Sequence, residues 1–110
     1  MLIVLVNLET VGLSAAIVMA ERRPALLRDA RWNDPMSAQK FRSRFGRGAP
    51  EADLVTWLQS NGFSVDRPHG QAIRTIESLP CNEVARIKWV RRANGTIDGA
   101  SAILSEAGCL

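Results

Sequence analysis

The side chains with the greatest chemical reactivity in this 110-residue chain are one histidine and two cysteines. His69 lies in the segment Arg67-Pro68-His69-Gly70, whose proline and glycine are typical of a turn, and a turn histidine beside an arginine is usually solvated. One histidine with two cysteines also makes an incomplete and oddly spaced set of metal ligands. The sequence contains no G-x-S-x-G, H-E-x-x-H, C-x-x-C or P-loop motif. We therefore predict a non-enzymatic protein without a metal or a cofactor.

The cysteines, Cys81 and Cys109, flank two predicted strands that Asn94-Gly95 joins as a hairpin, in a turn expected to be of type I′. Positions at similar distances from the turn meet across a hairpin, so both thiols should lie at its open end, where a disulfide can form. A disulfide closing this loop would add roughly 3–4 kcal/mol of stability and would favour an oxidising compartment such as the periplasm. Two unrelated free thiols are the alternative.

The elements that position these residues are predicted to form one small α+β domain over residues 34–110. Asp34-Pro35 is a typical helix start, for a helix over residues 36–45. Pro50 begins a second helix, which Asn61-Gly62-Phe63 closes. Turn motifs and alternating apolar residues then predict strands over residues 63–66, 72–76, 81–90 and 97–104. The expected fold is two short helices packed on a small antiparallel sheet of three to four strands, behind an N-terminal hydrophobic helix.

The N-terminal segment, residues 1–20, is apolar and contains no lysine or arginine. A transmembrane helix needs ~20 largely apolar residues, so the segment is just long enough to span a bilayer. Glu9 opposes insertion by roughly 2.5–3.5 kcal/mol, unless it is protonated or faces a partner helix. Gly12, Ala15 and Ala16 are small and would let another helix approach closely. We predict a membrane anchor that packs on a larger membrane complex.

Two other interpretations of residues 1–20 stay open. Val18-Met19-Ala20 resembles the cleavage site of a secretory signal, although the segment lacks the basic region that such signals carry. Leu2 to Val6 would also make a good buried strand of a cytoplasmic regulatory domain. Arginines in the predicted juxtamembrane linker, residues 21–33, favour a cytoplasmic domain by the positive-inside rule, whereas a disulfide favours the periplasm.

Basic residues gather near the predicted anchor and on the first predicted helix. They are Arg22, Arg23, Lys40, Arg42, Arg44 and Arg47. Contact with anionic lipid headgroups, at ~1 kcal/mol per basic residue, or with an acidic partner is one interpretation, and an ordinary solvated face is the other. The net charge of +3 does not demand nucleic acid, and aromatic residues that stack on bases are not interleaved with the cations.

Four stretches of the sequence resemble a known group of proteins. They are Trp32-Asn33-Asp34-Pro35-Met36, Ala49-Pro50-Glu51-Ala52-Asp53-Leu54-Val55 with Trp57-Leu58, Leu79-Pro80-Cys81-Asn82-Glu83, and Ser105-Glu106-Ala107-Gly108-Cys109-Leu110. Over residues 32–110 the chain resembles small membrane-anchored envelope proteins of alphaproteobacteria, a family with no known activity, so no functional residues carry over. Those proteins have a basic part in their anchor that this chain lacks. The order of elements is also similar to the two-layer domains of outer-membrane assembly lipoproteins, but no lipobox cysteine is present.

From these observations we expect a membrane-anchored accessory or interaction subunit of a larger envelope complex. It would be single-pass in the bacterial inner membrane, with the globular domain in the periplasm. A secreted or periplasmic binding domain, matured near Ala20, is the alternative, and a cytoplasmic regulatory domain is a third possibility.

Overall fold

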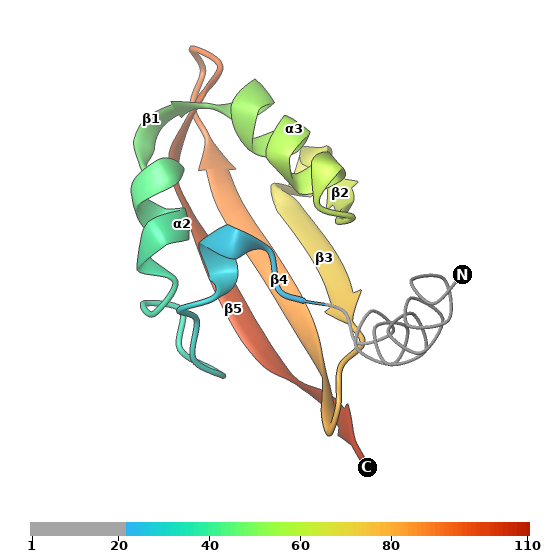
Figure 1. Cartoon of the computed structure of the whole chain (residues 1–110). Helices are drawn as coiled ribbons and strands as arrows, with labels where there is room; N and C mark the ends of the chain where they lie inside the picture. The colour runs from blue at the N-terminus through green and yellow to red at the C-terminus, as the bar shows by residue number, and fades with distance from the viewer. Residues whose placement is uncertain (1–21) are drawn as a thin grey trace, which may run out of the picture.

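The computed structural model describes residues 22–110 (Figure 1). The predicted membrane segment, residues 1–20, lies outside the described residues together with Glu9, Gly12, Ala15 and Ala16. Within residues 22–110, none of the helices is both long enough and apolar enough to cross a membrane.

An antiparallel sheet of five strands dominates the structure, in the order β1-β5-β4-β3-β2. Its strands are β1 (Arg47–Pro50), β2 (Ser64–Asp66), β3 (Gln71–Ile76), β4 (Cys81–Arg91) and β5 (Thr96–Cys109). The prediction of an α+β domain with three to four strands behind a transmembrane helix is therefore wrong. The described chain is mostly sheet, its helices are short, and β5 continues well past the end at residue 104 that the pattern indicated.

Strand β1 is the element that the sequence pattern did not predict, because Gly46-Arg47-Gly48 reads as a break between helices. It pairs with β5 through Arg47 opposite Asp98 and Pro50 opposite Thr96, with an irregular register between the two pairs. Gly48 lies at this irregularity with a φ of 91°, a conformation that favours glycine. Proline and glycine are tolerated here because β1 is an edge strand.

Two helices, α2 (Gln39–Arg44) and α3 (Glu51–Ser60), lie on one face of the sheet (Figure 1). The prediction for α3 is confirmed: Pro50 precedes it, and Gly62, at a φ of 77°, follows its last turn, where the Phe63 amide bonds the Leu58 carbonyl. Helix α2 is shorter than the predicted 36–45, because the residues after Asp34 form turns before the helix begins.

The core lies between the helices and the inner face of the sheet. Alternate residues of β4, namely Ala85, Ile87 and Trp89, point toward the helices, and this alternation follows the predicted pattern. The largest completely buried side chains are Phe41, Phe45, Leu27, Leu54, Leu58, Ile76, Ile87, Ile97 and Leu104. Burial of each stabilises the fold by about 1.5–3 kcal/mol, which holds both helices on this face.

The turn between β4 and β5 lies where predicted, but its geometry differs from the type I′ turn expected. Gly95 has a φ of 82°, whereas Asn94 does not take the positive φ that a type I′ turn requires of both residues. The Gly95 amide bonds the Arg92 carbonyl, and the Arg92 amide bonds the Thr96 carbonyl, so three residues form the loop. The predicted hairpin is confirmed, with a loop one residue longer than a two-residue turn.

Candidate functional site

The described residues of the predicted linker pack on the domain. These residues, 22–33, cross the inner face of the sheet and include a 3-10 turn at Ala25–Leu27, in which Leu27 is completely buried. At the end of the linker, Trp32 forms a parallel bridge with Leu104 of β5, and the Asn33 amide bonds the Leu104 carbonyl at 2.7 Å. The linker is therefore part of the folded unit.

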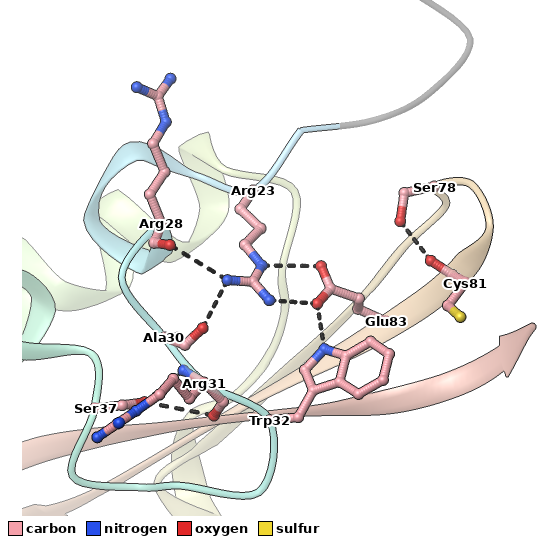
Figure 2. Close-up of polar contacts among 9 residues, drawn as sticks. All are labelled: Arg23, Arg28, Ala30, Arg31, Trp32, Ser37, Ser78, Cys81 and Glu83. Atoms are coloured by element: carbon pink, nitrogen blue, oxygen red, sulfur yellow. Dashed lines mark hydrogen bonds and ion pairs between the residues drawn. The ribbon is translucent and has the colours of Figure 1, made fainter.

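A buried carboxylate, Glu83 on β4, holds this linker in place (Figure 2). Arg23 donates from Nε to Glu83 Oε1 at 2.9 Å and from Nη2 to Oε2 at 2.5 Å. The Trp32 indole nitrogen donates to Oε2 at 2.5 Å. We call Arg23, Trp32 and Glu83 the carboxylate junction. A two-pronged arginine–carboxylate contact of this kind defines both the distance and the orientation of its partners.

The guanidinium of Arg23 also organises the linker itself. Its Nη1 donates to the carbonyl of Ala30 at 2.7 Å and to that of Arg28 at 3.3 Å, so one side chain bonds the sheet and closes the linker on itself (Figure 2). The hydrogen bond from Arg23 lowers the pKa of Glu83, against the opposing effect of burial, and Trp32 lowers it further. The hydrogen bond to Glu83 raises the pKa of Arg23 in turn. Both groups are therefore charged at neutral pH.

The disulfide lies beside the junction, at the first residue of β4. Cys81 is paired in register with Cys109 of β5, and their Sγ atoms are bonded at 2.11 Å. The predicted pairing at the open end of the hairpin is thus confirmed. The Leu110 amide bonds the Pro80 carbonyl at 2.8 Å just beyond it. The disulfide and this hydrogen bond together hold the end of β4 that carries Glu83 against the end of β5.

A second buried carboxylate, Glu51, lies at the start of α3. It accepts the Trp89 indole N–H at 2.9 Å, Arg67 Nε at 3.0 Å on Oε1, and Arg91 Nε at 2.7 Å on Oε2. Burial raises the pKa of Glu51, but the hydrogen bonds from Trp89 and Arg67 and the charges of Arg91 and Arg67 outweigh it, so the pKa is lowered. We call Glu51, Arg67, Trp89 and Arg91 the helix cluster.

The structure spreads the six predicted basic residues over several places. Arg23 belongs to the carboxylate junction and Arg22 is exposed beside it. Lys40 and Arg44 are exposed on α2, with the Arg44 guanidinium 4.9 Å from the Phe45 ring centroid. Arg42 bonds the Met36 carbonyl and Arg47 is ion-paired with Asp98. Arg23 is thus engaged in a contact within the fold, and contact of the other five with lipid headgroups or an acidic partner stays a prediction.

The reactive side chains do not converge on a site. His69 Nδ1 lies 2.8 Å from Asp66 Oδ2 in an exposed turn. In the part of the chain that the structure describes, no three His, Cys, Asp or Glu residues lie close enough together to hold a metal ion.

The sequence pattern singled out neither Glu83 nor Glu51 as a site residue. The sequence did contain one signal for Glu83. It belongs to the same set of alternate residues of β4 as Ala85, Ile87 and Trp89, so the alternation that predicts an inner face also directs this carboxylate inward. A carboxylate on an inner face needs a cation or several donors. The sequence pattern offers no way to choose Arg23 among the many arginines.

Comparison of the chain with protein-family models, with curated proteins and with solved structures found no match.

Proposed function

We propose that the protein is a non-enzymatic interaction domain, attached to a membrane by its apolar N-terminal residues and working in an oxidising compartment of a bacterial envelope. The carboxylate junction carries this proposal. It bonds Arg23, which follows the apolar residues 1–20 almost directly, to the sheet through Glu83. A domain held this closely to its attachment segment keeps a defined position relative to the membrane, as a subunit of a larger assembly requires.

The disulfide supports an oxidising compartment. Disulfides persist in oxidising compartments and are rare in the reducing cytosol. The bond between Cys81 and Cys109 closes a long hairpin, so it constrains the unfolded chain and adds roughly 3–4 kcal/mol of stability. That is a large part of the stability of a domain of this size, so a cytosolic location would deprive the fold of much of its support.

The ionisation of the buried carboxylates supports a binding role rather than catalysis. Glu51 and Glu83 are the buried carboxylates within residues 22–110, and each is held ionised by fixed donors. General acid–base catalysis is most effective when the pKa lies near the working pH, whereas both of these pKa values are lowered. The groups therefore serve to position the backbone and not to exchange protons.

Membrane fractionation of cells that express the full chain tests the attachment. We expect the full chain in the membrane fraction after a high-salt wash, and a chain lacking residues 1–20 in the soluble fraction. Recovery of the shortened chain with membranes would contradict attachment through this segment. An intact mass that begins after Ala20 would instead favour a secreted binding domain.

The compartment is tested separately by alkylation of thiols in intact cells before lysis. We expect Cys81 and Cys109 to be protected until a reductant is added, because they are bonded to each other. Immediate labelling of both cysteines would contradict the proposal of an oxidising compartment. A variant with both cysteines changed to serine serves as the control for labelling elsewhere in the sample.

A further inference from the structure

The face of the sheet that points away from the helices carries a hollow. It has a volume of about 670 Å³. Lys88 and Val90 of β4 and Ser101 of β5 lie on its floor, because they alternate with core residues and therefore point outward. Residues from 35–47 form the wall beyond β5, and residues 69–71 form the opposite wall. We call this site the outer hollow.

The outer hollow is positively charged. Its lining includes the cations Arg42, Arg47 and Lys88 and a single acidic residue, Asp98, so three positive charges face one negative charge. Asp98 is already bonded to Arg47, with Oδ1 3.0 Å from Nε. Among the residues that the structure describes, Arg42 makes one hydrogen bond, from Nη1 to the Met36 carbonyl at 2.9 Å, which leaves its other donors to a ligand. An occupant that carries carboxylates would complement this charge.

The same hollow also exposes apolar surface. Met36 and Val90, which both line it, are 60% and 66% exposed and are among the large apolar side chains that the fold does not bury. Methionine has a flexible thioether that adapts to irregular partners. Apolar contact at the floor and wall with cations around it suits a segment that carries both apolar and acidic residues.

We propose that the outer hollow binds an acidic segment of a partner protein, in which Asp or Glu side chains alternate with apolar ones. This proposal rests on the proposed interaction role and names the chemistry of the partner. An acidic segment of a protein would supply both the negative charge and the apolar contact that this lining offers. Single-stranded nucleic acid is commonly bound by stacking of its bases on exposed aromatic faces, whereas Trp89, the aromatic residue of the lining, is buried.

Binding is measured with the full chain in detergent micelles and a short fluorescent peptide of alternating Glu and Leu. A peptide of alternating Lys and Leu is the charge control. We expect saturable binding of the acidic peptide only, weakened by salt, with nuclear magnetic resonance shifts at Lys88, Val90 and Ser101. No binding, equal binding of the two peptides, or shifts elsewhere on the domain would overturn the proposal.

Charge reversal locates the site. Lys88→Glu and Arg42→Glu are each expected to weaken binding at least tenfold, because each replaces an attraction with a repulsion. Lys40→Glu makes the same charge change on α2 outside the outer hollow and should leave binding within twofold. An equal loss in all three variants would show a general charge effect and would overturn the assignment. Circular dichroism of each variant verifies that it is folded.

Vesicles of phosphatidylglycerol separate a lipid from a protein occupant. If Lys88→Glu abolishes vesicle binding by the chain lacking residues 1–20 and leaves peptide binding intact, anionic lipid is the occupant and the proposal fails. Attachment of the full chain to membranes should not change in Lys88→Glu, since that attachment is assigned to residues 1–20. If Lys88→Glu loses peptide binding and stays attached to membranes, the result bears on the outer hollow alone. If membrane attachment alone is lost, the result bears on the proposed function.

Discussion

The carboxylate junction and the helix cluster use the same chemistry for different ends. In each, a buried glutamate accepts an indole N–H and arginine donors. In the helix cluster the partners come from η2 (Arg67–His69) and β4, so the bonds join the first residue of α3 to the sheet. In the carboxylate junction the partners come from the linker. One cluster stabilises the domain, and the other attaches to it the segment that leads to the N-terminus.

The two clusters also differ in how well solvent screens them. The side chains of Arg67 and Arg91 are 53% and 43% exposed, whereas that of Arg23 is 23% exposed. Charge pairs with exposed members are weakened by water and salt, and the helix cluster compensates by using two arginines. The carboxylate junction relies on one arginine, so a single substitution should open it.

The largest loss of stability is expected when the disulfide is removed. This bond lies next to the carboxylate junction and far along β4 from the helix cluster. Replacing Cys81 and Cys109 together with serine should lower the free energy of unfolding by roughly 3–4 kcal/mol. Amide hydrogen exchange should rise first around Glu83 and stay slow around Glu51 and Trp89. Urea unfolding and exchange measure the two effects, and equal loss of protection at both ends would show that the clusters are not independent.

Glu51→Ala should lower the free energy of unfolding by about 2–3 kcal/mol, since it leaves Trp89 without its acceptor and two arginines without their charge partner. The effect falls short of a fully buried pair because both arginines reach solvent. Urea unfolding measures the loss. If Arg67→Ala and Arg91→Ala each cost as much as Glu51→Ala, neither arginine compensates for the loss of the other.

Glu83→Ala should destabilise the domain less, by about 1 kcal/mol, because the linker can open locally while the helices stay packed on the sheet. Trypsin should then cleave after Arg28 or Arg31 much faster than in the unchanged protein. Arg23→Ala should reproduce this, and Glu51→Ala, at a temperature where it stays folded, should not. Unchanged cleavage in Glu83→Ala would show that burial of Leu27 alone holds the linker.

Acid should weaken both clusters for the same reason, which is protonation of their glutamates. The pKa of Glu51 and that of Glu83 are lowered in the folded protein from the ordinary 4.5, so their contribution is complete above pH 4.5 and is lost as the pH falls through the lowered values. Stability measured by urea unfolding should fall as the pH drops below 4.5. Glu51→Gln and Glu83→Gln should each flatten that dependence, and high salt should reduce the Glu51 contribution more.

Helix α3 and the β4–β5 hairpin were predictable from the sequence, whereas strand β1 was not. Helix α3, with acids in its first turn and Gly62 after its end, matched its prediction because caps act over a few residues. The β4–β5 hairpin and its disulfide followed from alternation and from the position of Asn94-Gly95. Strand β1 was missed because an edge strand of Arg, Gly, Ala and Pro has neither the alternation nor the composition that indicates a strand.

The sequence by itself determined the hairpin, the inner face of β4 and the paired cysteines, since each depends on periodicity or on distance from one turn. Only the tertiary structure decided which arginine meets Glu83, because Arg23 is 60 residues away and looks like every other arginine of the linker. It also decided that Met36, Arg42 and Lys88 line one hollow, since these residues come from separate elements. Contacts between distant segments depend on how the layers pack, and local patterns do not encode that packing.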